Sequence, residues 1–324
     1  MISRHGLVCA FKMLVMVLLG VVFVAERARA EWAGVLTAEG VYTDNVRSQE
    51  GAARRGEFYT VLGGGISWGQ SKKRFLPAET SLLAKGRLFS ESPEFNYYEI
   101  RPRATFAFGR NQLELEYVLT PDRLFFDRSE DVGPRGAFYT GHTFAGRVSR
   151  KLGERKRLRV YLSWDLIWRN FAPPDDARDD FTVLGEVRMR YRVAPIFVPE
   201  VAFEYGRRNA VRNNFDRNQA RLAVGFESRL TSWLVVKVRY KYSHRDYTVG
   251  SDRVVGGSRN RNFGRVDNRQ DFEGRLAVPV PYVDGLSLRV RYKYRASNSS
   301  RPGRTFTRNE VGVELAYVLR GISW

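Results

Sequence analysis

Strict alternation between apolar and charged residues is the feature that most constrains how this chain can fold. The stretch VRYKY occurs twice, at residues 238–242 and 290–294, and in both copies the second and fourth residues are bases. Successive side chains of a β-strand point to opposite faces. Each copy therefore predicts a strand with one apolar and one basic face. A soluble sheet would bury the apolar face in a core, whereas a membrane barrel would turn it to lipid and the bases to the lumen.

The same unit recurs from Trp32 onward: a segment of roughly ten alternating residues, followed by a turn or a loop. Fourteen such segments are predicted, at residues 34–46, 58–68, 79–89, 98–108, 112–123, 138–150, 158–169, 182–193, 198–207, 219–230, 234–247, 272–280, 287–297 and 309–324. Short connections, such as 109–111 and 194–197, alternate with longer polar ones. This asymmetry is typical of outer-membrane barrels, and an even strand count places both termini on the short-turn, periplasmic side.

We therefore predict an all-β fold over residues 31–324: a single transmembrane antiparallel β-barrel of about 14 strands, with 12 and 16 as the alternatives. A soluble β-sandwich would alternate in a similar way. Aromatic residues such as Trp68, Trp168 and Tyr242 recur near segment ends, where interfacial girdles fall, and this favours the barrel. No helical period follows Ala30, and no later apolar run is long enough for a transmembrane helix.

The two ends of the chain carry targeting features. Residues 1–30 combine the bases Arg4 and Lys12, an apolar run at 13–25 and the small-residue sequence ARA at 28–30. This order predicts a cleaved secretory signal peptide. The last segment ends on Trp324, which resembles the assembly signal that outer-membrane barrels present to their insertion machinery. Trp324 has the opposite parity to the apolar face of that segment, and a bulge near Gly321 would restore it.

Charge and cysteine usage narrow the class of protein further. The formal net charge of +19 suits nucleic acid, a membrane surface or an anionic solute. A secreted chain without a nucleic-acid-binding signature points away from nucleic acid. Cys9 is the one cysteine and it lies inside the predicted signal, so the mature chain has neither disulfides nor a cysteine-ligated metal. No cofactor and no metal site is predicted.

One short motif carries a family resemblance. Residues 39–46 read EGVYTDNV, with Tyr42, Asp44 and Asn45 in a Y-x-D-N pattern. This stretch resembles the opening of many proteobacterial β-barrel proteins of the porin type, some of them encoded beside exopolysaccharide-export systems. Residues 217–247 resemble the hairpins of the same group. The resemblance implies a pore or an export conduit, with periplasmic polysaccharide-export components as partners.

The predicted lumen face is strongly basic on three segments. Ten bases share the inward parity: Arg188, Arg190, Arg192, Lys237, Arg239, Lys241, Arg289, Arg291, Lys293 and Arg295. Glu186 is the one acid in line with them on these segments. A run of like charges in a low-dielectric tube attracts anions. We predict these ten bases as lumen contacts for an anionic solute.

A purely structural alternative explains the same bases. Glu200 and Glu204 lie on the segment after one basic set, and Glu310 and Glu314 lie on the segment after another. Cross-strand ion pairs could then close the lumen with Arg–Glu ladders and make the chain a structural or assembly barrel. A barrel of about 14 strands lies between those that side chains fill and those that leave a channel, so width does not decide between the two.

Barrel enzymes are the third class considered. His142 shares parity with the lipid-facing residues, and Phe144 stands where barrel phospholipases, which this strand resembles in texture, carry a serine. His244 with Asp246 could form a rim site if loop acids such as Asp175, Asp176 or Asp252 faced them. The acidic loop 173–180 lacks the spacing of a calcium loop, so a solvated loop is expected. We predict no enzyme activity.

The prediction is therefore an outer-membrane, porin-like β-barrel with a basic lumen. It passes anionic solutes or an acidic exopolysaccharide across the outer membrane by diffusion or guided passage. The expected partners are outer-membrane lipid and lipopolysaccharide, the barrel insertion machinery and polysaccharide-export components, and no nucleic acid.

Overall fold

The structure is a computed structural model of the chain, and it describes residues 31–45, 56–69, 79–92, 95–127, 135–153, 157–172, 179–211, 216–231, 233–247, 263–301 and 304–320. These residues form fourteen strands: β1 Glu31–Thr43, β2 Glu57–Gly69, β3 Glu79–Phe89, β4 Tyr97–Phe108, β5 Asn111–Asp127, β6 Arg135–Leu152, β7 Leu158–Phe171, β8 Asp180–Tyr191, β9 Phe197–Ala210, β10 Arg217–Arg229, β11 Val235–Asp246, β12 Val266–Pro279, β13 Leu286–Ser299 and β14 Phe306–Arg320.

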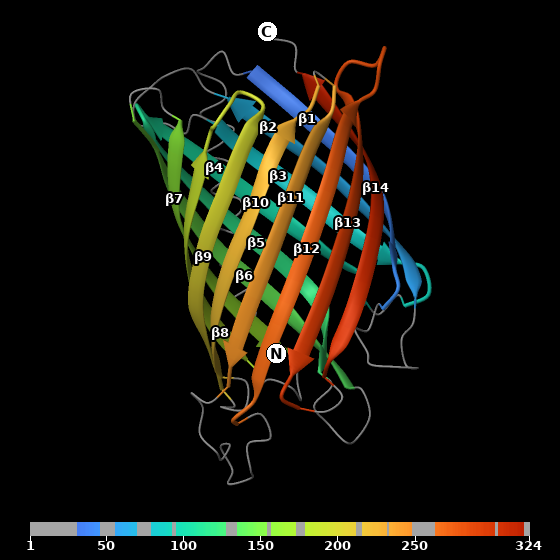
Figure 1. Cartoon of the computed structure of the whole chain (residues 1–324). Coiled ribbons are helices and arrows are strands. Elements are labelled where there is room, and N and C mark those ends of the chain that lie inside the picture. The colour runs from blue at the N-terminus through green and yellow to red at the C-terminus, as the bar shows by residue number, and fades with distance from the viewer. Residues whose placement is uncertain are drawn as a thin grey trace, which may run out of the picture.

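The strands form one closed antiparallel barrel in which each strand pairs with its neighbours in sequence and β1 pairs with β14 (Figure 1). This confirms the predicted barrel and its fourteen segments, and it excludes the sandwich. The largest difference in bounds is at β12, which begins at Val266 rather than at residue 272. Its first residues turn polar side chains such as Asn268 and Gln270 outward, so apolar alternation is missing there, while backbone pairing to β11 and β13 continues.

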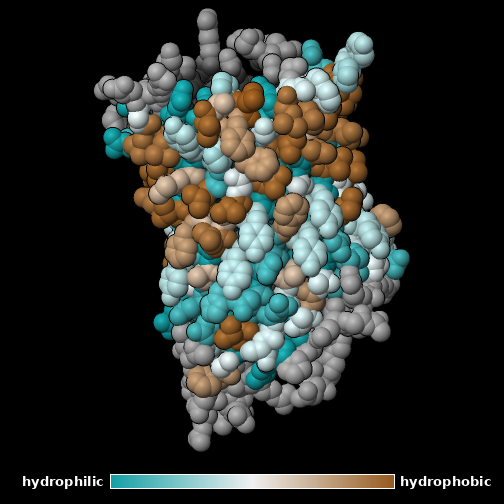
Figure 2. All heavy atoms as spheres, in the orientation of Figure 1, coloured by the Kyte–Doolittle hydropathy of each residue, from teal (hydrophilic) through white to brown (hydrophobic). Residues whose placement is uncertain are grey.

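The outer surface is divided along the barrel axis. On the face shown in Figure 2, hydrophobic residues gather over the half nearer the short turns, and hydrophilic residues cover the half nearer the longer loops. Outward side chains such as Leu222, Leu276 and Val313 are exposed, and none of the described residues covers them. An apolar band of this kind is the lipid-facing surface of a membrane barrel, for which strands of about 9–11 residues suffice. Most strands here have more residues than this, and the additional residues extend the barrel beyond the apolar band at the end that carries the longer loops.

The two ends of the barrel differ in their connections. The "turn end" carries the connections 70–78, 109–110, 153–157, 192–196, 230–234 and 280–285, and the "loop end" carries the other seven, of which 247–265 is the longest. Gly285 has φ 82° in its turn, and a Cβ there would lie 2.3 Å from the backbone oxygen of Val318. A residue with a side chain would therefore clash at this turn. Both described termini, Glu31 and Arg320, lie at the turn end.

Several predicted features lie outside the described residues: the signal peptide 1–30 with Cys9, the terminal Trp324 with the bulge near Gly321, and the acids Asp175, Asp176 and Asp252. They stay predictions. In the part of the chain that the structure does describe, no helix has the length and apolarity needed to cross a membrane.

The Y-x-D-N motif closes the barrel. Asp44 accepts hydrogen bonds from the backbone nitrogen and the Nδ2 of Asn309, both at 2.7 Å. Asn45 donates from Nδ2 to the backbone oxygen of Thr307 at 2.8 Å. Both contacts join the end of β1 to the start of β14, across a seam between residues more than 260 positions apart in sequence. The motif thus has a structural role that is independent of any solute.

Candidate functional site

The lumen wall is the candidate site, and the backbone register fixes which side chains reach it. On β8 and β11, the residues Val187, Met189, Tyr240 and Tyr242 are exposed on the outer surface, so the bases between them face inward. The same parity turns the bases of β13 inward. Nine of the ten predicted bases lie on these three strands; Arg192 follows the end of β8, in a connection at the turn end.

Most of the inward arginines are matched by carboxylates. The ion pairs are Arg188–Glu186 at 2.7 Å, Arg190–Glu227 at 3.1 Å, Arg190–Glu200 and Arg239–Glu200 at 3.6 Å, Arg289–Glu314 at 2.7 Å, Arg291–Glu39 at 2.9 Å and Arg295–Asp271 at 2.8 Å. The alternation along a single strand did not predict the acids that neighbouring strands place beside these arginines, such as Glu39, Glu227 and Asp271. Of the four acids named for the structural alternative, Glu200 and Glu314 bind the predicted bases, whereas Glu204 binds Arg221 and Glu310 binds Arg308.

Two inward glycines let arginines reach across a strand. Gly225 on β10 lies opposite both Glu200 on β9 and Arg239 on β11, and these two side chains meet over it. Gly312 on β14 has the same role, because Arg291 on β13 crosses it to Glu39 on β1. A Cβ at Gly312 would lie 2.5 Å from Oε1 of Glu39. A glycine at inward parity is the sequence signal that could have predicted these bridges.

The lumen lysines differ from the arginines. Among the described residues, no carboxylate lies within ion-pair distance of Lys237, Lys241 or Lys293, or of Lys85 on β3, which the sequence reading did not select. A compact ammonium on a flexible stem does not match a carboxylate in the two-point way that a guanidinium does.

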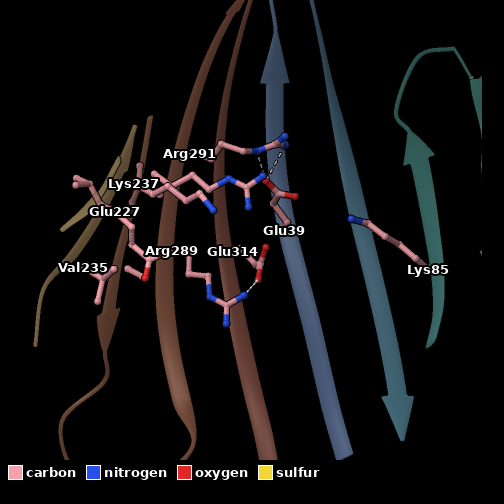
Figure 3. A pocket seen from close by; sticks show the side chains of 12 residues that line it. Glu39, Lys85, Glu227, Val235, Lys237, Arg289, Arg291 and Glu314 are labelled. Atoms are coloured by element: carbon pink, nitrogen blue, oxygen red, sulfur yellow. Dashed lines mark hydrogen bonds and ion pairs between the residues drawn. The ribbon is translucent and has the colours of Figure 1, made fainter. Parts of the chain in front are cut away.

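A cavity of about 430 Å³ brings both kinds of base together toward the turn end. Its charged lining consists of Lys85, Lys237, Arg275, Arg289, Arg291, Glu39, Glu227 and Glu314, so bases outnumber acids five to three. Figure 3 shows Lys237 and the Arg289–Glu314 and Arg291–Glu39 pairs around this space, with Lys85 reaching toward it from the strand β3. The side chains of Arg289 and Arg275 are 46% and 56% exposed, so the cavity is wet. Its surplus of positive charge favours anions.

At the loop end the charged groups are buried instead. Asp180 on β8 has a side chain that is 0% exposed, and it binds Arg169 at 2.9 Å and Arg208 at 2.6 Å. Asp267 on β12 accepts hydrogen bonds from Arg265 at 2.5 Å and from Ser299 at 2.6 Å. Buried carboxylates that each bind a guanidinium make a rigid polar layer near this mouth of the lumen.

The two histidines considered for catalysis both lie on the outer face, and the loop acids Asp175, Asp176 and Asp252 that were named as partners lie outside the described residues. His142 faces outward on β6, and its Nδ1 shares a hydrogen bond of 2.7 Å with the hydroxyl of Tyr117, beside the ring of Phe144. His244 also faces outward, and its Nδ1 hydrogen-bonds to Oδ1 of Asn268 at 2.9 Å. Within the described ranges, no three His, Cys, Asp or Glu side chains are grouped as metal ligands.

Comparison with known proteins supports the fold and goes no further. No family model matches the chain, and no curated protein sequence does. An outer-membrane channel from Pseudomonas putida F1 has a TM-score of 0.50 at 8% sequence identity over 90% of this chain and 96% of that chain. The outer-membrane channel DcaP of Acinetobacter baumannii has a TM-score of 0.49 at 9% identity, over 90% and 97%. An anion-selective porin from Comamonas acidovorans has a TM-score of 0.47 at 9% identity, over 90% and 99%.

The fold of the Pseudomonas putida channel, with its TM-score of 0.50, confirms the predicted resemblance to outer-membrane barrels at the level of architecture. At such low identity the likeness concerns the fold alone. Solute, enzyme activity and partners have to be argued from the residues of this chain.

Proposed function

We propose that this protein is an outer-membrane channel that favours anionic solutes and has no enzyme activity. The observation that carries the proposal is the cavity of about 430 Å³, in which five bases face three acids and Lys85 and Lys237 have no ion-pair partner among the described residues. Partner-free ammonium groups in a low-dielectric tube raise the local concentration of anions. The apolar outer band supports placement in a membrane, with the turn end toward the periplasm.

Nine of the ten bases predicted from the sequence then divide into two roles, and Arg192, which lies in a connection at the turn end, has neither. The arginines on β8, β11 and β13 that bind carboxylates hold the wall in shape, and Lys237, Lys241 and Lys293 contact the solute. An acidic polysaccharide is one anionic solute that such a surface suits. The Y-x-D-N motif lends no support to that finer assignment, because its contacts close the barrel.

The test is the reversal potential of the purified barrel in a planar bilayer under a potassium chloride gradient. Wild-type protein should show discrete conductance steps and an anion-selective reversal potential. The double variant Lys85→Gln, Lys237→Gln should move that potential toward cations. The matched control is Arg150→Gln, Arg207→Gln, which removes two bases from the outer face of β6 and β9 and should leave it unchanged.

One observation favours a second candidate, the structural barrel closed by Arg–Glu ladders: six of the ten predicted bases are in ion pairs. That candidate predicts a silent bilayer although the barrel is folded and heat-modifiable on gels. A silent bilayer would therefore reject the channel, and cation selectivity would reject the anion preference. Hydrolysis of a lipid or peptide substrate that is lost in His244→Ala would reject the non-enzymatic assignment.

A further inference from the structure

Two arginines at the loop end have no counter-ion in the part of the chain that the structure describes. Arg217 on β10 and Arg245 on β11 face inward near the mouth of the lumen. Among the described residues, neither has a carboxylate within ion-pair distance, and the Nε atom of each is buried without a hydrogen-bond partner. Both side chains are half-buried, and a guanidinium that is partly removed from water without a counter-ion destabilises a fold. Some group outside the described chain is expected to balance this charge.

Arginines add positive charge around this pair, and Asp267 is the acid that lies directly opposite Arg245 in the pairing of β11 with β12. Arg217 lies directly opposite Arg208 in the pairing of β9 with β10, a placement of like charges that destabilises a sheet. The charged groups that act on Arg245 include Arg217, Arg269 and Arg221, which have the same sign. We call Arg208, Arg217 and Arg245, on three consecutive strands, the "arginine cluster".

The carboxylates near the arginine cluster are engaged elsewhere. Asp180 is shared between Arg169 and Arg208, and Asp267 binds Arg265 and Ser299. Asp216 accepts a hydrogen bond from the backbone nitrogen of Ala210 at 2.7 Å. None of these acids is within ion-pair distance of Arg217 or Arg245. Asp267 therefore balances the charge of Arg245 only in part, because its carboxylate is bound to Arg265 and Ser299.

Tyr247, which follows the end of β11, shows the effect of the positive charge of these arginines on a neighbouring group. Its hydroxyl accepts hydrogen bonds from Arg217 at 3.1 Å and from Arg265 at 2.9 Å. Burial raises the pKa of the Tyr247 hydroxyl, but the arginines around it outweigh burial and hold the pKa below its ordinary value. The local potential therefore stabilises a negative charge.

We propose that the arginine cluster binds an oxyanion, the phosphate, sulfate or carboxylate group of a solute, at the loop-end mouth of the lumen. Guanidinium groups suit this ligand, because their planar fork donates two parallel hydrogen bonds to two oxygens, a geometry that chloride cannot use. The inference rests on the proposed function for the supply of anionic solutes. It goes beyond a general preference for anions, because it defines one saturable binding site and the chemical class of its ligand, an oxyanion.

The test measures binding without conductance. The folded barrel in detergent is titrated with inorganic phosphate, and separately with D-glucuronate, by calorimetry at constant ionic strength against chloride. Wild-type protein should bind at least one of them saturably. Arg217→Gln and Arg245→Gln should each weaken that binding about tenfold or more, because each removes charged hydrogen bonds. Arg147→Gln, an inward base on β6 at 3.7 Å from Glu114, is the matched control and should bind as wild type does.

The two probes separate the sources of the group. Binding of phosphate alone assigns the site to phosphate, free or esterified, and binding of glucuronate assigns it to carboxylate-bearing sugars. The proposal is overturned if neither anion binds better than chloride, or if Arg245→Gln binds as tightly as wild type.

Folding of the variants is checked by thermal unfolding in phosphate-free buffer. Arg245→Gln should unfold close to the wild-type temperature, because the repulsion from Arg217, Arg269 and Arg221 that it removes offsets the attraction to Asp267 that it loses. A marked loss of stability in that buffer would reveal a structural partner for Arg245, and it would also overturn the proposal. A silent bilayer with intact phosphate binding would reject the channel function and leave this site standing.

Discussion

The two ends of the lumen manage positive charge in different ways. Around the cavity toward the turn end, the predicted arginines bind glutamates one or two strands away, the side chains are partly exposed, and Lys85 and Lys237 are left without ion pairs among the described residues. At the loop end, the carboxylates are buried and Arg217 and Arg245 have none in contact within that same part of the chain. Under the proposed function, an arginine that is bound to a carboxylate holds the wall in shape, and a base without a carboxylate is where an anion is expected to bind. The number of bases alone would not separate these roles.

The largest expected effect comes from removing one buried carboxylate at the loop end. Asp180→Asn leaves Arg169 and Arg208 buried without their shared partner, which should lower the free energy of unfolding by about 3–5 kcal/mol. Glu314→Gln at the turn end should cost no more than about 1 kcal/mol, because Arg289 is 46% exposed there and water screens the pair. Urea-dependent unfolding and refolding in lipid vesicles measures both. If the two variants lost the same free energy of unfolding, ion pairs would contribute equally to stability at the two ends of the barrel, and the contrast drawn above would be wrong.

Filling a glycine gap should have an intermediate effect. In Gly312→Leu, the new Cβ would lie 2.5 Å from Oε1 of Glu39 and would force it away from Arg291. Overpacking of this kind costs about 1–3 kcal/mol. Gly40→Leu is the control, because Gly40 faces outward on β1 and a Cβ there meets nothing within 4 Å. Unfolding in urea should separate the two variants, and a neutral Gly312→Leu would show that the strand-crossing pair is dispensable.

These contrasts show what the sequence could and could not predict. Alternation predicts strands and their inward faces, and the segment 79–89 coincides with β3. Alternation fails at the start of β12, where Asn268 and Gln270 face outward beyond the apolar band. It also says nothing about pairs across strands: Glu39 and Arg291 are 252 positions apart, and their contact depends on barrel closure between β1 and β14. Lys85 lies on a strand without a run of bases, so charge density along one strand did not select it.

Ionic strength should act on the two ends to different extents. Raising the salt from 0.1 M to 1 M shortens the Debye length from about 10 Å to about 3 Å. The anion preference of the exposed cavity should then fall several-fold, as reversal potentials at the two concentrations would show. Binding of phosphate to the arginine cluster should weaken less, since buried and directly hydrogen-bonded charges are screened less. If the affinity for phosphate fell as steeply with salt as the anion selectivity of the channel, phosphate would be held at the loop end by diffuse electrostatic attraction and not at a defined binding site.

The smallest effect is expected on the outer face of the loop end. His244 and Asn268 are neighbours there and hydrogen-bond to each other, but the apolar band lies nearer the turns and the lumen lies on the opposite side of the strand. His244→Ala should change the free energy of unfolding by no more than about 0.5 kcal/mol and leave both the reversal potential and phosphate binding as in wild type. Arg245, the next residue, faces inward, and Arg245→Gln should weaken phosphate binding about tenfold or more. If only the Arg245 substitution changes phosphate binding, the side of the strand on which a residue lies decides whether it contacts the anion. A large effect of His244→Ala would instead indicate a functional role for the outer face.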